Sequence, residues 1–224
     1  MIRTVTAFRW VPPFAQGLVR DLRVRWVLEE AGLAYDEHLI GPQDQASPAH
    51  RALQPFGQVP VLEEDGHAMF ESGAIVLHVA EACDALMPAD ATERSRVRTW
   101  MFAALNTIEP AIMMLTVIDL QPGGAQEGAK ELRAAVVGMI EKRLDALSAY
   151  LDDREHLVAG RFTAADLLMT SVLRILRNTD LVETRLTLAA YRRRGEARPA
   201  FAKALAAQLA PFAANAPPER SAKA

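Results

Sequence analysis

One proline constrains the fold of this chain more than any other residue. Pro60 separates Gly57-Gln58-Val59 from the apolar pair Val61-Leu62, where a strand pattern begins. Proline has no backbone N–H and cannot donate to a strand ladder, so it belongs at a sheet edge or at a special bend. A cis bond between Val59 and Pro60 would turn the Val59 main chain outward, where it can pair with a peptide ligand like an added strand. The alternative interpretation is an ordinary edge-strand proline.

The segments around this proline alternate between strand and helix patterns. Asp65-Gly66 between two short apolar runs predicts a tight hairpin, and Ser72 is placed to cap the helix that follows. The expected order is strand, helix, strand, short helix, strand, strand and helix, over residues 2–8, 16–32, 35–40, 48–53, 61–64, 67–70 and 73–83. A β-α-β unit followed by a hairpin and a helix predicts a compact α/β domain over residues 1–85.

The composition changes after this domain. Residues 86–91 have the character of a linker, and residues 92–212 are helical by periodicity, with abundant Ala and Leu. Pro122-Gly123-Gly124 separates two long helices, and further helices are expected over 163–177 and 199–212. The last segment, 213–224, is rich in Ala, Pro and polar residues and is expected to be a disordered tail. The second domain is therefore predicted to be all-α.

Glu71-Ser72 stands where a helix begins, and this pair can bind a zwitterion. The carboxylate of Glu71 would take an ammonium group, while Ser72 and the amides of the helix N-terminus would take a carboxylate. The structural interpretation is that Ser72 is only an N-cap, and both roles are compatible. Further along, Thr163 and Asp166 form a capping box before an apolar helix, a role that is structural.

In this order and spacing, these segments closely resemble the cytosolic glutathione transferases, in particular bacterial-type members. The resemblance extends from Ile2 to about Phe212, and residues 23–32 are similar to the first helix of that family. It implies a thioredoxin-like domain that binds glutathione, a helical domain that forms the pocket for the second substrate, a cytoplasmic homodimer and a detoxifying role. Carried over by motif, the glutathione-binding residues are Gln58, Val59, cis Pro60, Glu71 and Ser72.

The chain departs from the family where the glutathione sulfur is usually bound. Family members place a Tyr, Ser or Cys after the first strand, but residues 7–34 contain no Ser, Thr, Cys or Tyr. A free thiol has a pKa of about 8.5 and needs stabilisation of its anion to react at neutral pH. The candidates are the amides of Gln16, Gly17 and Leu18 at a helix N-terminus. The other candidates are the side chains of Arg9, Trp10, Gln16 and Arg20.

The second-substrate pocket is expected to combine Trp10 with the first helix of the second domain. Asn106, Glu109 and Met113 are spaced to share one helical face, and Pro110 is expected to bend that helix. A face of this composition is also compatible with an ordinary core.

Composition and charge exclude several classes of function. The net charge of -3 gives no basis for binding nucleic acid or an anionic membrane, and no apolar run reaches the length of a membrane helix. Cys83 is the only cysteine, so the chain cannot form an intramolecular disulfide, which fits a reducing compartment. Cys83 itself is interpreted as a buried or structural residue. The histidines are scattered, so no metal site is expected.

Two classes of function therefore remain. The first is an enzyme that conjugates the glutathione thiolate, as co-substrate, to a small hydrophobic electrophile. The second is a non-catalytic protein of the same fold that binds glutathione or a protein partner. A glutathione-dependent isomerase or peroxidase is a further possibility within the enzyme class.

Overall fold

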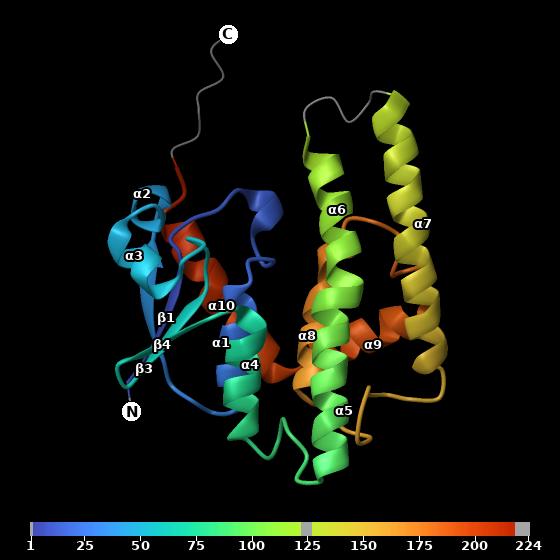
Figure 1. Cartoon of the computed structure of the whole chain (residues 1–224), viewed down its shortest axis with the longest axis horizontal. Coiled ribbons are helices and arrows are strands. Elements are labelled where there is room, and N and C mark those ends of the chain that lie inside the picture. The colour runs from blue at the N-terminus through green and yellow to red at the C-terminus, as the bar shows by residue number, and fades with distance from the viewer. Residues whose placement is uncertain (1, 122–126, 218–224) are drawn as a thin grey trace. The chain divides into compact units, whose positions relative to one another are not determined.

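The computed structural model describes residues 2–121 and 127–217 and divides into two compact units (Figure 1). The first unit is Met1–Val76 with Pro199–Ala224, and the second unit is Leu77–Arg198. The sequence-based boundaries differ, since they place residues 77–85 in the first domain and residues 199–212 in the second. The structure groups the last helix with the first unit because that helix packs along a helix near the N-terminus.

The first unit is built on a four-stranded sheet with the order β2-β1-β3-β4. Its strands are β1 (Arg3–Phe8), β2 (Asp36–Ile40), β3 (Val61–Glu64) and β4 (His67–Phe70). Strand β1 is parallel to β2 and antiparallel to β3, and β3 is antiparallel to β4. Asp65 and Gly66 both have positive φ, at 48° and 82°, as the predicted tight hairpin requires. The α/β prediction for this part of the chain is confirmed.

In the described part of the chain, the helical segments beside this sheet are η1 (Pro13–Ala15), α1 (Asp21–Glu30), α2 (Pro42–Gln45), α3 (Pro48–Leu53), α4 (Ser72–Glu81) and α10 (Pro199–Ala214). The boundary between the two units falls within α4, after Val76. Helices α2 and α3 lie on the side of the sheet away from α1 (Figure 1). The prediction of a continuous helix over 16–32 is wrong at its start. Gly17 has φ of 76°, in the left-handed region, so the chain turns there and α1 begins only at Asp21.

A polar network, buried except at the exposed Glu37, joins α10, α1 and β2 inside the first unit. The Gln208 side-chain amide donates to the carbonyl of Val19 at 3.0 Å and to the carboxylate of Asp21 at 2.6 Å. Arg25, which is fully buried, pairs with Asp21 at 2.8 Å and with Glu37 on β2. Burial alone would lower the pKa of Arg25, but the two carboxylates outweigh it and raise that pKa above its ordinary value. Helix α10 is therefore anchored by hydrogen bonds as well as by apolar contact.

The second unit is helical, which confirms the prediction for this region. Its segments are α5 (Ala91–Phe102), η2 (Ala103–Ile108), α6 (Glu109–Leu120), α7 (Glu127–Tyr150), α8 (Ala164–Leu173), η3 (Arg174–Leu176) and α9 (Leu186–Glu196). The predicted separator Pro122-Gly123-Gly124 lies outside the described residues. Segment η2 is a π-helix, in which the amide of Glu109 donates to the carbonyl of Ala104, five residues earlier. Pro110 has no amide hydrogen to continue the α-helical ladder, so the irregularity falls at the proline, near where a bend was predicted.

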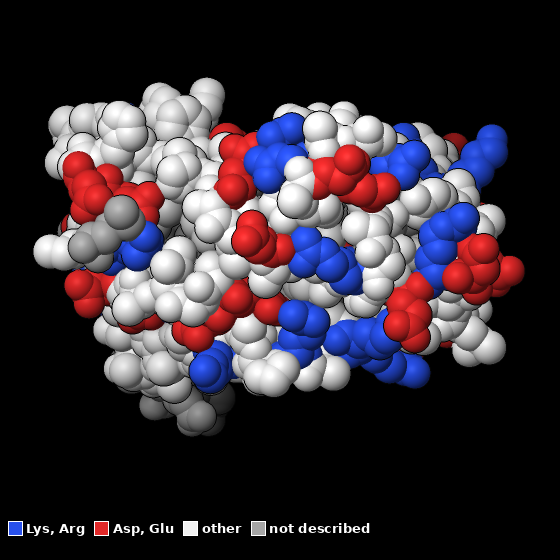
Figure 2. Space-filling model, turned by 90° about the horizontal axis from the view of Figure 1, so that it is seen from below, with Lys and Arg blue, Asp and Glu red and all other residues white. Residues whose placement is uncertain are grey.

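The continuous helical segment Ala91–Leu120 is long and apolar enough, by length and composition, to cross a membrane. The same test is passed by core helices of globular proteins. Here α5 packs against α8, and α6 packs against α7. On the face shown in Figure 2, basic and acidic side chains are interspersed.

The capping box predicted for α8 is present, and its carboxylate accepts more hydrogen bonds than the sequence indicated. The buried carboxylate of Asp166 accepts from the amide and the hydroxyl of Thr163, at 2.9 and 3.0 Å. It also accepts from the amide of Leu157 and from the hydroxyl of Tyr191, each at 2.9 Å. Four donors on three segments of the second unit therefore meet at one carboxylate.

Candidate functional site

Three chain segments meet at one end of the sheet. Val61 pairs with Phe70 across the hairpin and with Thr6 across the β1–β3 ladder. The residues before β3, the residues after β4 and the residues after β1 therefore leave the sheet at the same end. This topology brings Gln58-Val59-Pro60 and Glu71-Ser72 together, as the sequence-based site requires.

Glu71 and Ser72 form the charged corner of this site. Glu71 is exposed and holds φ of 70°, an uncommon conformation for a residue with a side chain. Ser72 is the first residue of α4 and is buried, and its hydroxyl accepts a hydrogen bond from Arg23 Nη1 at 3.3 Å. An exposed carboxylate thus stands beside a hydroxyl, a buried guanidinium and the positive end of a helix. This arrangement suits a ligand that carries an ammonium group and a carboxylate close together.

The second part of the site is the segment before β3. The Val59–Pro60 bond is cis, as predicted, and Pro60 stands at a bend that leads into β3. Strand β3 lies between β1 and β4, so the alternative of an ordinary edge-strand proline is wrong. The side chain of Gln58 is exposed, while Val59 and Pro60 are buried.

The turn after η1 does not present free amides to a thiolate as predicted. The amide of Gln16 donates to the carbonyl of Pro13 at 3.2 Å, and the amide of Leu18 donates to Ala15 at 3.0 Å. Neither residue lies at the N-terminus of α1, because that helix begins at Asp21 with Arg20 as its N-cap. The assignment of thiolate stabilisation to the amides of Gln16 and Leu18 is therefore corrected: these donors are already used inside the turn.

The positive end of α1 also carries its own anion. Asp21 is the first residue of the helix, and its buried carboxylate lies where a helix N-terminus would otherwise favour a ligand anion. Burial raises the pKa of Asp21, and the ion pair with Arg25 and the hydrogen bond from Gln208 oppose that shift. The carboxylate of Asp21 therefore makes the start of α1 less favourable for a thiolate.

Three of the candidate side chains differ in their surroundings. Gln16 Nε2 donates to the carbonyl of Val11 at 3.1 Å and so holds the turn together. Arg9 is exposed, and its guanidinium reaches the carbonyl of Leu39 and the carboxylate of Asp44, the latter at 3.6 Å. Arg20 is half-buried at the end of the turn.

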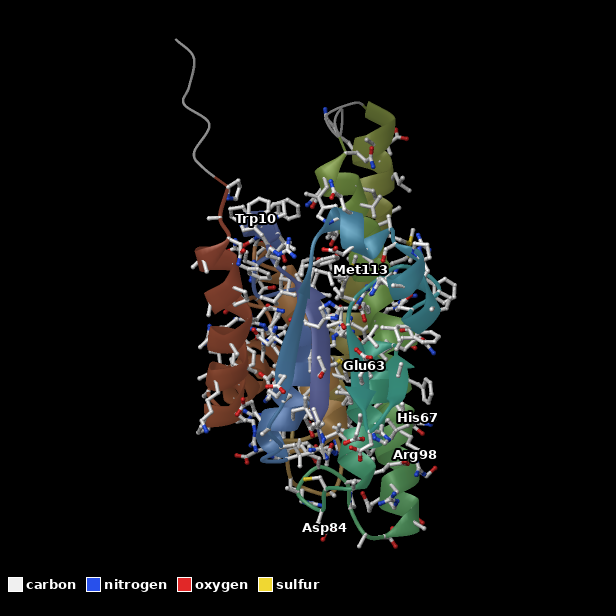
Figure 3. All side chains as sticks on the ribbon, turned by 90° about the vertical axis from the view of Figure 1, so that its left-hand side faces the viewer. Trp10, Glu63, His67, Asp84, Arg98 and Met113 are labelled. Carbon is white, nitrogen blue, oxygen red and sulfur yellow. The ribbon has the colours of Figure 1, made fainter. Side chains whose placement is uncertain are left out.

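The residues predicted for a second-substrate pocket belong to both units. Trp10 is half-buried in the segment after β1, and Met113 is half-buried on α6 (Figure 3). Asn106 is exposed in η2, whereas Glu109 is 5% exposed. The expectation that these two share one face assumed a regular α-helix, and the π-helical turn changes the angular step between them. The pocket itself stays a prediction.

Sequence patterns did not identify Arg23 as a site residue. Arg23 was included only in residues 23–32, which are similar to the first helix of the glutathione transferases. It is 4% exposed, although a basic residue is rarely buried without a partner. Among the described residues, no group of three or more His, Cys, Asp and Glu side chains is placed to bind a metal ion.

Two regions of the chain match the two domains of one known protein family. The N-terminal domain of glutathione S-transferase matches residues 15–81, and its C-terminal domain matches residues 104–199. Glutathione S-transferase 4 of Zea mays is 29% identical over 225 residues, with 96% of this chain and 97% of the maize protein covered. Maleylacetoacetate isomerase of Rhizobium meliloti is 34% identical over 148 residues, which cover 64% of this chain and 68% of the isomerase.

A solved structure of similar fold is a glutathione transferase of Burkholderia graminis, crystallised with two glutathione molecules per subunit. Its TM-score is 0.78 at 24% identity, with 91% of this chain and 87% of that chain covered. The fold is thus the one that joins a thioredoxin-like domain to an all-helical domain. The chain belongs to the glutathione S-transferase family. Its expected place among the bacterial-type members stays a prediction, because these relatives come from a plant and from bacteria.

Proposed function

We propose that this protein binds glutathione at the end of the sheet and conjugates its thiolate to a small hydrophobic electrophile. The observation that carries the proposal is the corner formed by Glu71, Ser72 and Arg23. Glu71 would bind the ammonium group of the γ-glutamyl end, and Ser72 with Arg23 would bind its carboxylate. Val59 would pair with the peptide backbone of glutathione, and Gln58 would lie near its cysteinyl or glycyl part.

The chemistry assigned to this site is nucleophilic substitution. The thiol loses its proton to solvent, and the thiolate attacks an electrophilic carbon. A carbon–sulfur bond forms as the leaving group departs with its electron pair. The protein contributes by holding the two reactants together and by favouring the anion of the thiol. The proposal places the reaction in the cytoplasm, where the half-buried Cys83 stays a thiol.

The direct test is calorimetric titration of the full chain with glutathione, followed by a conjugation assay with a chromogenic aryl halide. We expect saturable binding and formation of a thioether. Absence of glutathione binding would overturn the proposal. Binding without conjugation of any aryl halide, epoxide or unsaturated carbonyl compound would favour the non-catalytic alternative.

We predict that the protein lowers the pKa of the bound thiol by about one unit or less, equivalent to about 1.4 kcal/mol. The reason is that the amides of Gln16 and Leu18 are occupied and that Asp21 places negative charge at the start of α1. Ultraviolet absorbance of bound glutathione thiolate against pH measures this shift. We expect Arg20→Ala to remove it and Arg20→Lys to retain part of it. A shift of two units that persists in Arg20→Ala would contradict this prediction.

A glutathione-dependent isomerase is the second candidate. The observation in its favour is the 34% identity to the maleylacetoacetate isomerase over 148 residues. In such a reaction the thiolate adds to a conjugated double bond and is later expelled, so glutathione is regenerated rather than consumed. Measuring whether glutathione is consumed with a cis-dienone substrate separates the isomerase from the transferase.

We also propose that the protein is a homodimer, as implied by its family. Phe56 is 64% exposed at the tip of the loop before β3, where a large apolar side chain gains by burial against a second copy. Light scattering should give about twice the chain mass of 24.5 kDa. Phe56→Ser should raise the dissociation constant of the dimer by about thirtyfold or more, as for a central contact. Phe14→Ser is the matched control, because Phe14 is 54% exposed in the same unit. A native chain that is monomeric at micromolar concentration contradicts this proposal.

A further inference from the structure

The loop that carries Gln58 and Val59 has no ladder of its own, yet its carbonyl groups are bound by side chains. Arg51 Nη1 donates to the carbonyl of Pro55 at 2.9 Å, and Gln45 Nε2 donates to the carbonyl of Gly57 at 2.5 Å. The next carbonyl, that of Gln58, is 2.9 Å from Nε2 of His50. All three donors come from helices α2 and α3, so side chains of these two short helices hold the loop in place by hydrogen bonds.

The backbone amide and the backbone carbonyl of His50 are both hydrogen-bonded to nearby residues of the chain. Its amide donates to the hydroxyl of Ser47, the N-cap of α3, at 3.2 Å, and its carbonyl accepts from the amide of Gln54 at 2.8 Å. The residue is 5% exposed. Because a carbonyl oxygen only accepts, Nε2 of His50 carries the proton in this contact. The imidazole is therefore a fixed donor with little freedom to leave the carbonyl of Gln58.

We infer that His50 is a positioning residue for glutathione binding, an inference that rests on the proposed function. The carbonyl of Gln58 and the amide of Val59 belong to one planar peptide unit, and that unit is trans. Fixing the carbonyl on one side therefore fixes the direction of the N–H on the opposite side. A hydrogen bond to the carbonyl also polarises the peptide and strengthens its N–H as a donor. His50 thus sets the orientation and strength of the main-chain donor that is proposed to pair with glutathione.

Three substitutions separate this role from a merely structural one. His50→Gln keeps an amide donor of nearly the same reach, and His50→Asn keeps the donor chemistry but shortens the side chain by one methylene. His50→Leu removes the donor and retains an apolar body. Binding of glutathione is measured by calorimetry, Km and kcat by conjugation kinetics, and folding by the melting temperature of each variant.

We expect His50→Asn and His50→Leu to weaken glutathione binding about tenfold, as for the loss of one buried hydrogen bond. His50→Gln should remain within about threefold of the native chain, since its donor still reaches the carbonyl. The value of kcat at saturating glutathione should stay unchanged in all folded variants, because His50 acts on binding and not on the sulfur. Equal affinity in the native chain and in His50→Asn overturns the inference, and so does a His50→Gln variant as weak as His50→Leu.

The outcome distinguishes this inference from the proposed function. A native chain that does not bind glutathione fails both. A native chain that binds glutathione and loses affinity on Glu71→Ala, but not on His50→Asn or His50→Leu, supports the function and rejects the role of His50. Should His50→Leu fail to fold, the comparison of His50→Gln with His50→Asn still decides, since these two differ only in reach.

Discussion

Replacing Asp166 with alanine is expected to lower the free energy of unfolding by about 3–5 kcal/mol. The carboxylate is 1% exposed and accepts from four donors, which belong to Leu157, Thr163 and Tyr191. Alanine would leave these donors buried without an acceptor, and each such group costs about 1–3 kcal/mol. The cost of lost hydrogen bonds therefore exceeds the ordinary contribution of an N-cap, about 1 kcal/mol.

Thermal unfolding of the full chain tests this expectation. A loss of this size lowers the melting temperature by about 10 °C, at about 2–4 °C per kcal/mol for a chain of this length. Asp152→Ala is the matched control in the same unit, because Asp152 is exposed, and it should change stability by about 0.5 kcal/mol or less. Tyr191→Phe removes one donor and one bond only, so it should have a much smaller effect than Asp166→Ala. An unchanged melting temperature together with lost glutathione binding would show that Asp166 belongs to the site instead.

The second large effect is expected at Glu71. Glu71→Ala should weaken glutathione binding by about 1.5–3 kcal/mol, or about 10- to 150-fold, as for a charge-assisted contact. The side chain is exposed and makes this contribution only when a cation is present, so stability without ligand should change little. Calorimetry measures the affinity, and thermal unfolding without ligand measures the stability.

The backbone at Glu71 makes the choice of variants important. At φ of 70° alanine is as strained as glutamate, so the alanine variant isolates the loss of the carboxylate. Glu71→Gln keeps shape and removes charge, and it should lose most of the affinity that alanine loses. Asp36→Ala is the control, since Asp36 is exposed and pairs with Thr4, toward the opposite end of the sheet. Glutathione affinity equal to the native value in Glu71→Ala would remove Glu71 from the site.

The sequence by itself predicted the elements whose signals are local. The Asp65-Gly66 hairpin and the Thr163–Asp166 capping box both follow from residues a few positions apart, whose conformations are decided by sterics and nearby hydrogen bonds. The resemblance to the glutathione transferases placed Val59 and Glu71 in one site, and the register of the sheet then showed that the two segments leave it at the same end. Periodicity also separated the α/β part from the helical part.

Only the tertiary structure decided the features that depend on distant partners. It placed Arg23 on the hydroxyl of Ser72, His50 on the carbonyl of Gln58 and Gln208 on Asp21. It also showed that the amides of Gln16 and Leu18 are used within their own turn, which a helix prediction from apolar spacing could not reveal. Apolar periodicity reports which face of a segment is buried, but it carries no information on which polar group across the core meets which. Those pairings are fixed by the cost of leaving a buried donor or acceptor unsatisfied, and that cost is defined only when the whole chain is folded.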